Sequence, residues 1–281
     1  MVESLDARYA EIAAQRPAQE EAFAKFVAET GAARFVAEAA ALGISLDVAT
    51  GHISYAPDFS VPTLSFDLMY CRHGKTTGNT EPRVYQGFVD EPQNALNATG
   101  LRQAEDAADL LDGMGLTPDL VICSPLSRAH RTGEAYFRRH PALAAKVELW
   151  DDAAEMRFGA WDNVMVKDLP DDSIGHLFYL AQNAVVKPAE PYLSPEGKKY
   201  AAENFVEVLT RMQAVLRKLD ERMAPLAAQG RRPLVVMYGH SMCGAALAIL
   251  TGNGKVVDGK AYLGFDGKYI MPNATPVYLH K

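Results

Sequence analysis

The chain has 281 residues, of which 48% are hydrophobic and 22% charged, and its net charge is −7. This composition is typical of a globular protein with a sizeable core and excludes a disordered chain. The acidic balance argues against nucleic acid as a partner, because binding a phosphate backbone needs a net or local excess of Lys and Arg. Any anionic substrate must therefore be bound by a local cluster of cations.

No segment has the pattern of a membrane or export signal. The first residues, MVESLDARYAEIAAQ, contain acids and no apolar core, and no window approaches the ~18 uncharged apolar residues that a membrane-spanning helix needs. Cys71, Cys123 and Cys243 are an odd count without metal-site spacing. This predicts a reducing compartment, no disulfide framework and no structural zinc. We therefore expect a soluble, cytoplasmic protein that does not bind a membrane.

The N-terminal part has a character of its own. Residues 1–43 are rich in Ala, Glu and Gln and carry apolar residues at helical spacing, with Pro17 at a helix start. Apolar and polar residues then alternate over 46–55 around a Gly-containing turn, which predicts a β-hairpin. We expect residues 1–63 to form a helical and hairpin extension.

From residue 64 onward, strand patterns alternate with helix patterns. Strands are predicted for LSFDLMYC (64–71), LVIC (120–123), VELW (147–150) and PLVVMY (233–238), and helices for 99–111, 126–139, 202–226 and 243–250. The alternation predicts an α/β fold, a three-layer sandwich whose mostly parallel central sheet is covered by helices on both faces. Thr99 is the expected N-cap of the first of these helices. We expect residues 64–281 to be the catalytic domain, with a cap-like insertion at about 159–197.

Polar clusters follow the predicted strands. Arg72-His73 comes after the first strand, the segment 124–128 after the second, Glu155 just past the third and His240-Ser241 after the fourth. Ligands of open α/β sheets bind outside the carboxyl ends of the strands, so these side chains are expected to line one crevice. Each cluster alone has a structural explanation, such as a hydrogen-bonded histidine or a solvated cation. Their joint occurrence at strand ends favours a functional site.

The residue types in these clusters suit phosphoryl chemistry. Arginine forks match phosphate oxygens and neutralise the charge on them. A neutral histidine nitrogen can attack phosphorus and form a covalent intermediate. A carboxyl group can protonate the leaving alcohol and then deprotonate the incoming water. This set of groups needs no metal and no other cofactor.

Several motifs occur in a fixed order along residues 64–281: the run from Arg72 to Asn79, Gln86-Gly87, the run 96–104, SPLSRAHRT (124–132), Glu155 with Gly159 and Trp161, and His240. Together they resemble the histidine phosphatase superfamily, the phosphoglycerate mutase-like enzymes. The resemblance implies a metal-independent phosphomonoesterase of the histidine acid phosphatase type. Such an enzyme acts on a small-molecule phosphate through a phosphohistidine.

The resemblance also implies a role for each matching residue. The implied catalytic residues are His73 as the phosphorylated nucleophile, Glu155 as the proton donor, and Arg72, Arg128 and His240 as the phosphate pocket. Further substrate contacts are implied for Asn79, Gln86, Gly87 and Ser241. The sequence departs from the family at Ser241, because a Gly usually follows the histidine there.

Three other functions compete with this interpretation. A cysteine-dependent phosphatase is excluded, because four residues separate Cys123 from Arg128 where its phosphate loop needs five. A non-catalytic binding member would lack the nucleophile or an arginine, and neither is missing. The extension could still serve a homodimer or another partner.

A phosphoglycerate mutase is the third competitor. It must hold a second anionic group, yet 159–197 contains two lysines, six acids and no arginine. This favours a monoester with a neutral or partly apolar alcohol. The run 174–180 offers apolar surface for such an alcohol, or is simply a buried helix face. Lys75 and Arg131 are expected to be cations of a loop or a helix surface. In the alternative, Lys75, Arg83 and Lys198, which lie outside the insertion, could hold the second anionic group.

Overall fold

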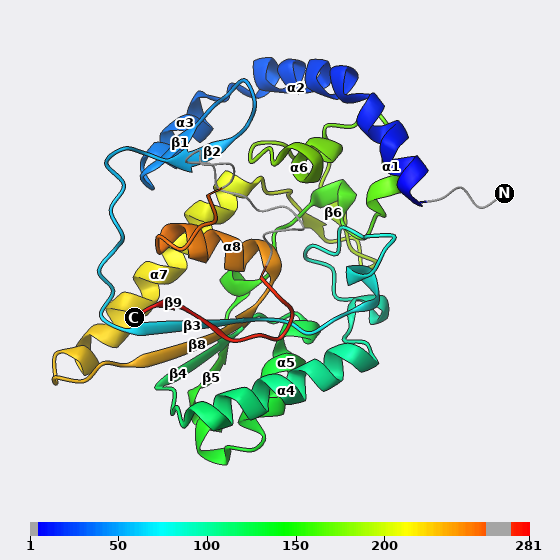
Figure 1. Cartoon of the computed structure of the whole chain (residues 1–281). Coiled ribbons are helices and arrows are strands. Elements are labelled where there is room, and N and C mark those ends of the chain that lie inside the picture. Colours follow the sequence, from blue (N-terminus) through cyan, green and yellow to red (C-terminus); the bar gives the residue numbers. More distant parts are fainter. Residues whose placement is uncertain (1–4, 257–270) are drawn as a thin grey trace.

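A computed structural model describes residues 5–256 and 271–281 (Figure 1). Its five-stranded central sheet has the order β5-β4-β8-β3-β9. Four neighbouring strands are parallel, and β9 runs antiparallel to β3 at one edge. The strands are β3 (Asp67–Arg72), β4 (Leu120–Cys123), β5 (Val147–Leu149), β8 (Leu234–Gly239) and β9 (Val277–His280). The predicted mostly parallel sheet is confirmed.

Successive strand residues point to two different cores. In β3, Leu68 and Tyr70 pack into the core that contains α7 and α8, whereas Met69 and Cys71 pack into the core beside α4. All six residues of β8 are buried. Because both faces are covered, the central strands are almost continuously apolar instead of alternating with polar residues. This explains why the strand predictions at 64–71 and 233–238 were accurate to within a few residues.

Helices cover both faces of the sheet (Figure 1). Helices α4 (Ala98–Met114) and α5 (Ser127–Phe137) lie on one face, and α7 (Phe205–Ala227) and α8 (Ser241–Leu250) on the other. The three-layer α/β sandwich is therefore confirmed. The predicted cap of α4 was wrong, because the extended Asn97 is the N-cap and its side chain accepts the Gly100 N–H.

The N-terminal residues form α1 (Leu5–Ala14), α2 (Arg16–Thr30), α3 (Ala33–Ala40) and the antiparallel hairpin of β1 (Ile44–Leu46) and β2 (Ile53–Tyr55). The expected hairpin is confirmed, and Pro17 lies in the first turn of α2. Phe23 and Phe35 belong to the same hydrophobic core as α7 and α8. Figure 1 shows α1 and α2 along the outer side of α6 (Gly175–Ala181).

The segment between β5 and α7 contains α6 and a small hairpin of β6 (Tyr192–Leu193) and β7 (Lys199–Tyr200). Both interpretations of the run 174–180 apply in part: Leu177 and Phe178 are buried, whereas Tyr179 is only partly buried. Within the described ranges, no helix is long and apolar enough to cross a membrane. All three cysteines are free and buried, as small hydrophobic residues of the core.

Candidate active site

A cavity of about 310 Å³ lies at the carboxyl ends of β3 and β8. Its lining brings together most of the residues that the sequence singled out: Arg72, His73, Asn79, Gln86, Gly87, Arg128, Glu155 and Ser241. His240 is not in the lining and stands behind His73, with 5.3 Å between the two ring centroids. Segments that are up to 170 residues apart thus meet at one edge of the sheet.

His73 has the geometry of a nucleophile. Its backbone N–H donates to Gly239 O at 2.9 Å, which fixes the end of β3 to the end of β8. Its Nδ1 lies 2.7 Å from Gly74 O. A carbonyl can only accept, so Nδ1 carries the proton and the lone pair is on Nε2. Burial, reinforced by the Arg128 and Arg72 guanidinium groups, lowers the pKa of His73 well below 6.5, so the ring is neutral.

His240 is held on two sides. Its Nε2 lies 2.7 Å from Ser124 Oγ, and Tyr70 Oη donates to its carbonyl at 2.7 Å. Burial, together with Arg128 and His73, lowers the pKa of His240 well below 6.5. Its Nδ1 is buried and has no hydrogen-bond partner among the residues that the structure describes. Two neutral imidazoles therefore stand side by side.

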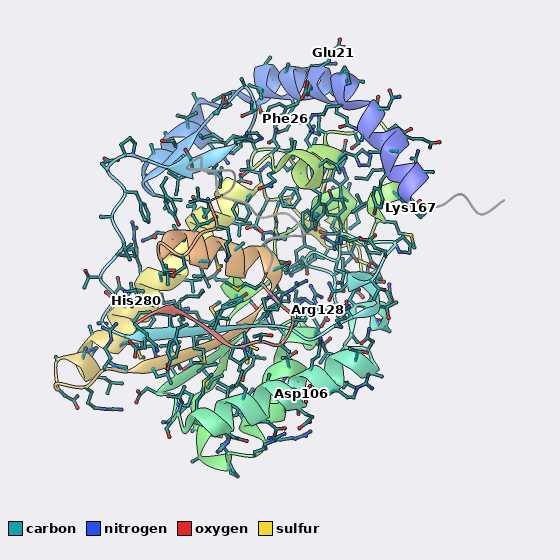
Figure 2. The ribbon with its side chains drawn as sticks, viewed as in Figure 1. Glu21, Phe26, Asp106, Arg128, Lys167 and His280 are labelled. Atoms are coloured by element: carbon teal, nitrogen blue, oxygen red, sulfur yellow. The ribbon has the colours of Figure 1, made fainter. Side chains whose placement is uncertain are left out.

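Arg128 is a buried cation that hydrogen-bonds to carbonyl groups. Its side chain is 1% exposed and donates to Gly87 O at 2.6 Å and Val89 O at 2.8 Å. Burial lowers the pKa of this guanidinium to about 10. A buried cation without a close anion is costly, and an anion in the cavity would relieve that cost. Figure 2 shows Arg128 in the interior, at the end of the sheet.

Arg72 adds a second cation to the same cavity. Its Nη1 donates to Met271 O at 2.9 Å, and its Nε is buried without a partner in residues 5–256 and 271–281. Burial lowers the pKa of Arg72 as well. The two guanidinium groups and the neutral His73 ring make this wall a site for a small, strongly anionic group such as a phosphoryl group, and His240 stands behind His73.

Glu155 is oriented by the start of α8. Its carboxylate accepts from Met242 N at 3.1 Å, Cys243 N at 3.3 Å and Ser241 Oγ at 3.1 Å. The N-terminus of a helix favours a carboxylate, which explains the placement. Ser241 and Glu155 both line the cavity, so the Ser241 hydroxyl orients the proposed proton donor at the cavity wall.

The turn at Gln86-Gly87 requires a glycine. Gly87 has φ +46°, and a Cβ on it would lie 1.7 Å from Asp162 Oδ1. That carboxylate accepts the N–H groups of Phe88 and Phe158, and burial raises the pKa of Asp162 to about 8. Asp162 therefore supports the turn that holds Arg128, and it is not among the residues lining the cavity.

Comparisons with known proteins assign the family. Residues 68–255 match the model of the histidine phosphatase superfamily (branch 1). The chain belongs to this superfamily. It is also 43% identical over 298 aligned residues to the mannitol-1-phosphatase of Eimeria tenella, and the alignment covers 99% of this chain and 96% of that protein. The predicted family and the prediction of a phosphomonoesterase are thereby confirmed.

Solved structures of the superfamily share the fold. Mycobacterial hydrolase 1 superimposes with a TM-score of 0.56 at 24% identity, covering 76% of this chain and 90% of that chain. The mycobacterial glucosyl-3-phosphoglycerate phosphatase complexed with VO3 gives 0.55 at 24% identity, covering 76% and 92%. This likeness confirms the predicted phosphoglycerate mutase-like fold and goes no further.

Three side chains that support the site, Thr132, Tyr70 and Ser124, were given no role in the sequence analysis. Thr132 Oγ1 accepts the Gly74 N–H at 3.0 Å and donates to Arg128 O, so it ties the histidine loop to α5. Tyr70 is a strand residue whose hydroxyl binds His240. Ser124 stands at a strand end, a position that already signals the site. Tyr70 gives no such signal, because its sequence context is that of a buried strand.

The structure distinguishes among the cations that the sequence analysis considered. Lys75, expected at the surface, lines the histidine cavity together with Arg83. Arg131 lies elsewhere, in a hollow between α4 and α5. Lys198 lines a second cavity. The histidine cavity therefore has cations on its rim that come from outside the insertion at 159–197.

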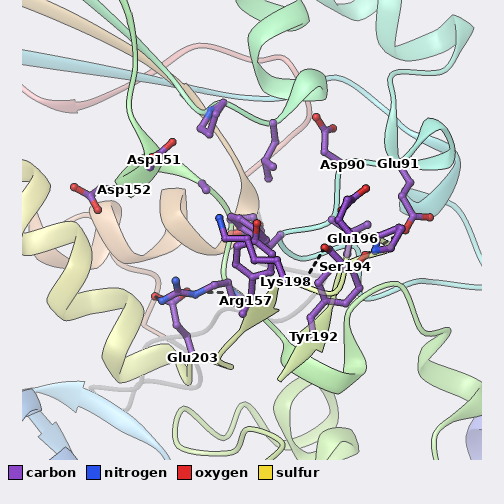
Figure 3. A pocket seen from close by; sticks show the side chains of 18 of the residues that line it. Asp90, Glu91, Asp151, Asp152, Arg157, Tyr192, Ser194, Glu196, Lys198 and Glu203 are labelled. Carbon is purple, nitrogen blue, oxygen red and sulfur yellow. Dashed lines mark hydrogen bonds and ion pairs between the residues drawn. The ribbon is translucent and has the colours of Figure 1, made fainter. Parts of the chain in front are cut away.

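The second cavity, of about 660 Å³, shares Glu155 with the first. Figure 3 shows Asp151 and Asp152 on one side of it and Asp90 and Glu91 on the other. These carboxylates would repel a phosphate group. The smaller cavity, which contains His73 and the two buried guanidinium groups, is thus the candidate active site.

Proposed function

We propose that the chain hydrolyses the monophosphate of a hexitol, mannitol 1-phosphate being the first candidate, through a phosphohistidine at His73. The observation that carries the chemistry is the neutral His73 ring, with its lone pair on Nε2, in a cavity shared with two buried guanidinium groups. The substrate class rests on the Eimeria tenella relative, which is similar along nearly the whole chain and is named a mannitol-1-phosphatase.

In the first step, His73 Nε2 attacks phosphorus and the bond between phosphorus and the ester oxygen breaks. Glu155 gives its proton to the departing alcohol oxygen. Arg72, Arg128 and His240 stabilise the charge on the phosphoryl oxygens as the transition state forms.

In the second step, a water molecule attacks the phosphohistidine. Glu155 accepts the proton of that water, the bond between phosphorus and Nε2 breaks, and inorganic phosphate is released with His73 neutral again. The guanidinium groups supply the electrostatic stabilisation that a metal would otherwise supply, so we propose a metal-independent reaction.

Glu155 is the stronger candidate for the acid. It lines the cavity, whereas Asp162 lies behind the turn that carries Gly87. Burial raises the pKa of Asp162 to about 8, but Asp162 does not line the cavity and has no access to the ester oxygen from that position.

One observation favours a second candidate, phosphoglycerate mutase-type phosphoryl transfer. Lys75 and Arg83 line the cavity and could hold the second anionic group of a phosphoglycerate. A hexitol phosphate uses the same two side chains differently, because its hydroxyl oxygens accept hydrogen bonds from them.

A panel of phosphomonoesters tests the proposal. We expect the purified chain to release inorganic phosphate from mannitol 1-phosphate with EDTA present, and to release it faster than from 3-phosphoglycerate. Isotope-labelled 3-phosphoglycerate is the control for the second candidate. Isomerisation to 2-phosphoglycerate with little free phosphate would contradict hydrolysis as the main activity, and strict dependence on an added metal would contradict the mechanism.

Two further proposals concern the location of the protein in the cell and its division into domains. We propose a cytoplasmic location, which the three free, buried cysteines support, because thiols persist in reducing compartments. We propose that residues 64–281 supply the catalytic groups and that 159–197 forms the cap over them. The position of Tyr179 in the cavity lining supports the second part.

A further inference from the structure

Two side chains that the superfamily motifs do not include contribute to the lining of the cavity. Arg83 and Tyr179 both line the cavity, and the Arg83 guanidinium carbon lies 5.8 Å from the centre of the Tyr179 ring. The ring of Tyr85 lies 5.0 Å from that of Tyr179 and packs it from behind. A guanidinium over an aromatic face is held in orientation, with donors left for a ligand.

Arg83 and Tyr179 stand on segments that are joined to each other. Arg83 O accepts from Val166 N at 2.9 Å, and Tyr85 N donates to Val164 O at 2.9 Å. The segment that follows, 167–174, leads directly into α6, which carries Tyr179. A displacement of 164–171 therefore moves both side chains relative to His73.

Helix α1 holds this pair of segments from outside. Arg8 donates from Nε and Nη2 to Lys167 O at 3.2 and 3.1 Å, and its Nη2 lies 2.5 Å from Asp171 Oδ1. Lys167 lies beside α1 in Figure 2. Tyr9 Oη donates to Glu81 Oε2 at 3.1 Å, and the same oxygen accepts the Arg83 N–H at 3.0 Å. Two adjacent residues of α1 thus reach both segments.

Helix α2 completes the support through a buried amide. Gln19 is fully buried, and its Nε2 donates to Ile12 O at 2.9 Å and to Asp171 O at 2.8 Å. One side chain therefore connects α1, α2 and the segment before α6. Buried hydrogen bonds of this kind fix relative positions, because breaking them leaves polar atoms unsatisfied.

We propose that Arg83 and Tyr179 form the subsite for the leaving alcohol, and that α1 and α2 are positioning elements of this subsite. The subsite suits a polyol, because Arg83 and the nearby Lys75 and Asn79 donate to hydroxyl oxygens while the Tyr179 ring contacts the carbon chain. The inference rests on the proposed function. It also gives the N-terminal helices a role, since the superfamily match begins only at residue 68 whereas the Eimeria tenella alignment spans 99% of the chain.

The test compares two substrates, mannitol 1-phosphate and p-nitrophenyl phosphate, whose leaving group has no aliphatic hydroxyls. For Arg83→Met we expect KM for mannitol 1-phosphate to rise about tenfold or more, the effect of losing a charged hydrogen bond, with kcat for p-nitrophenyl phosphate within threefold of wild type. Arg8→Ala and Tyr9→Phe should raise KM for mannitol 1-phosphate severalfold and leave both constants for p-nitrophenyl phosphate within twofold.

Lys25→Ala is the matched control, because Lys25 is an exposed cation on α2 whose ion pair is with Glu29 of the same helix. Lys25→Ala should leave kcat and KM unchanged for both mannitol 1-phosphate and p-nitrophenyl phosphate. Tyr9→Phe removes one hydroxyl group and keeps the result interpretable if Arg8→Ala proves unstable. Equal losses on both substrates, or no loss on either, would overturn the inference.

Failure of the proposed function gives a different result. In that case wild type releases phosphate from p-nitrophenyl phosphate but not from mannitol 1-phosphate, and the variants are compared on the best monoester of the panel. A change in the ratio of kcat/KM values between that monoester and p-nitrophenyl phosphate would still support the subsite. An unchanged ratio would refute it.

Discussion

Arg128 links the stability of the chain to the binding of phosphate. Burial lowers the pKa of Arg128 from 12.5 to about 10, which at about 1.4 kcal/mol per pKa unit means that folding penalises this charge by ~3 kcal/mol. We expect an anion bound in the cavity to offset most of that energy. Since each 1.4 kcal/mol is about tenfold in a dissociation constant, Arg128→Met should weaken the binding of inorganic phosphate by ~10²-fold.

The same substitution should have little effect on folding. Truncating a large buried side chain usually costs about 2–5 kcal/mol. Here the substitution removes the hydrogen bonds to Gly87 O and Val89 O, which costs about 1–3 kcal/mol for each acceptor left unsatisfied. Removal of the buried charge offsets this cost. We expect the free energy of unfolding of Arg128→Met to lie within about 2 kcal/mol of wild type.

Two measurements check this. Isothermal titration calorimetry gives the dissociation constant of phosphate. Urea unfolding with and without phosphate gives the increase in the free energy of unfolding on binding, which is about 2.7 kcal/mol when the phosphate concentration is a hundred times the dissociation constant. Arg128→Lys keeps the charge but cannot reach both carbonyls, and serves as the comparison. Phosphate affinity within threefold of wild type in Arg128→Met would refute the reasoning, and so would a loss of 4 kcal/mol or more of stability, on the order of a full core truncation.

Three further predictions concern the catalytic groups. His73→Ala should abolish turnover, and acid-labile phosphate should be recovered from acid-quenched wild type but not from the variant. Glu155→Gln should slow mannitol 1-phosphate by about 10²- to 10⁴-fold and p-nitrophenyl phosphate far less, because nitrophenolate leaves without a proton; equal losses would mean that the acid lies elsewhere. Finally, His73 and His240 are neutral when folded, with pKa values well below 6.5, so as the pH falls through 6.5 the unfolded chain takes up protons first. The free energy of unfolding should then drop by about 1 kcal/mol per histidine between pH 6.5 and 5.5, and a slope that persists in the double variant His73→Gln, His240→Gln would show that other groups cause it.

The sequence predicted the parts of the site that depend on strand ends. Arg72, His73 and His240 directly follow or end strands whose apolar runs are unmistakable, because both faces of the sheet are covered. The rule that ligands bind at the carboxyl ends of parallel strands then brings these residues together without any knowledge of the loops. The helix positions were predicted from their apolar spacing. The N-cap of α4 was misplaced by two residues, because Asn97 and Thr99 are both good capping residues.

The rule for strand ends does not decide which side chains form the rim of the cavity, although Lys75 and Arg83 were named as possible clamp residues. Lys75 and Arg83 lie in a loop without a periodic pattern, and Tyr179 belongs to an apolar run in which Phe178, its neighbour, is fully buried. One residue of helical rotation decides which of these two rings faces the core, and composition does not contain that information. Counting cations in the insertion alone therefore underestimated the positive charge at the cavity.

The structural support of each group explains why the phosphoryl chemistry of this site is easier to predict than its substrate. The groups that meet phosphorus are held by the sheet itself: His73 N binds Gly239 O, and Tyr70 binds His240. The groups around the alcohol are held by side-chain contacts with helices outside the sheet, such as the contact of Arg8 in α1 with Asp171. The carboxyl ends of the central strands tolerate few substitutions. A rim built from loops and outer helices can be substituted without disturbing the phosphate pocket. Specificity in this chain should therefore respond to substitutions in α1 and α2 that lie far from His73 and leave the phosphoryl chemistry intact.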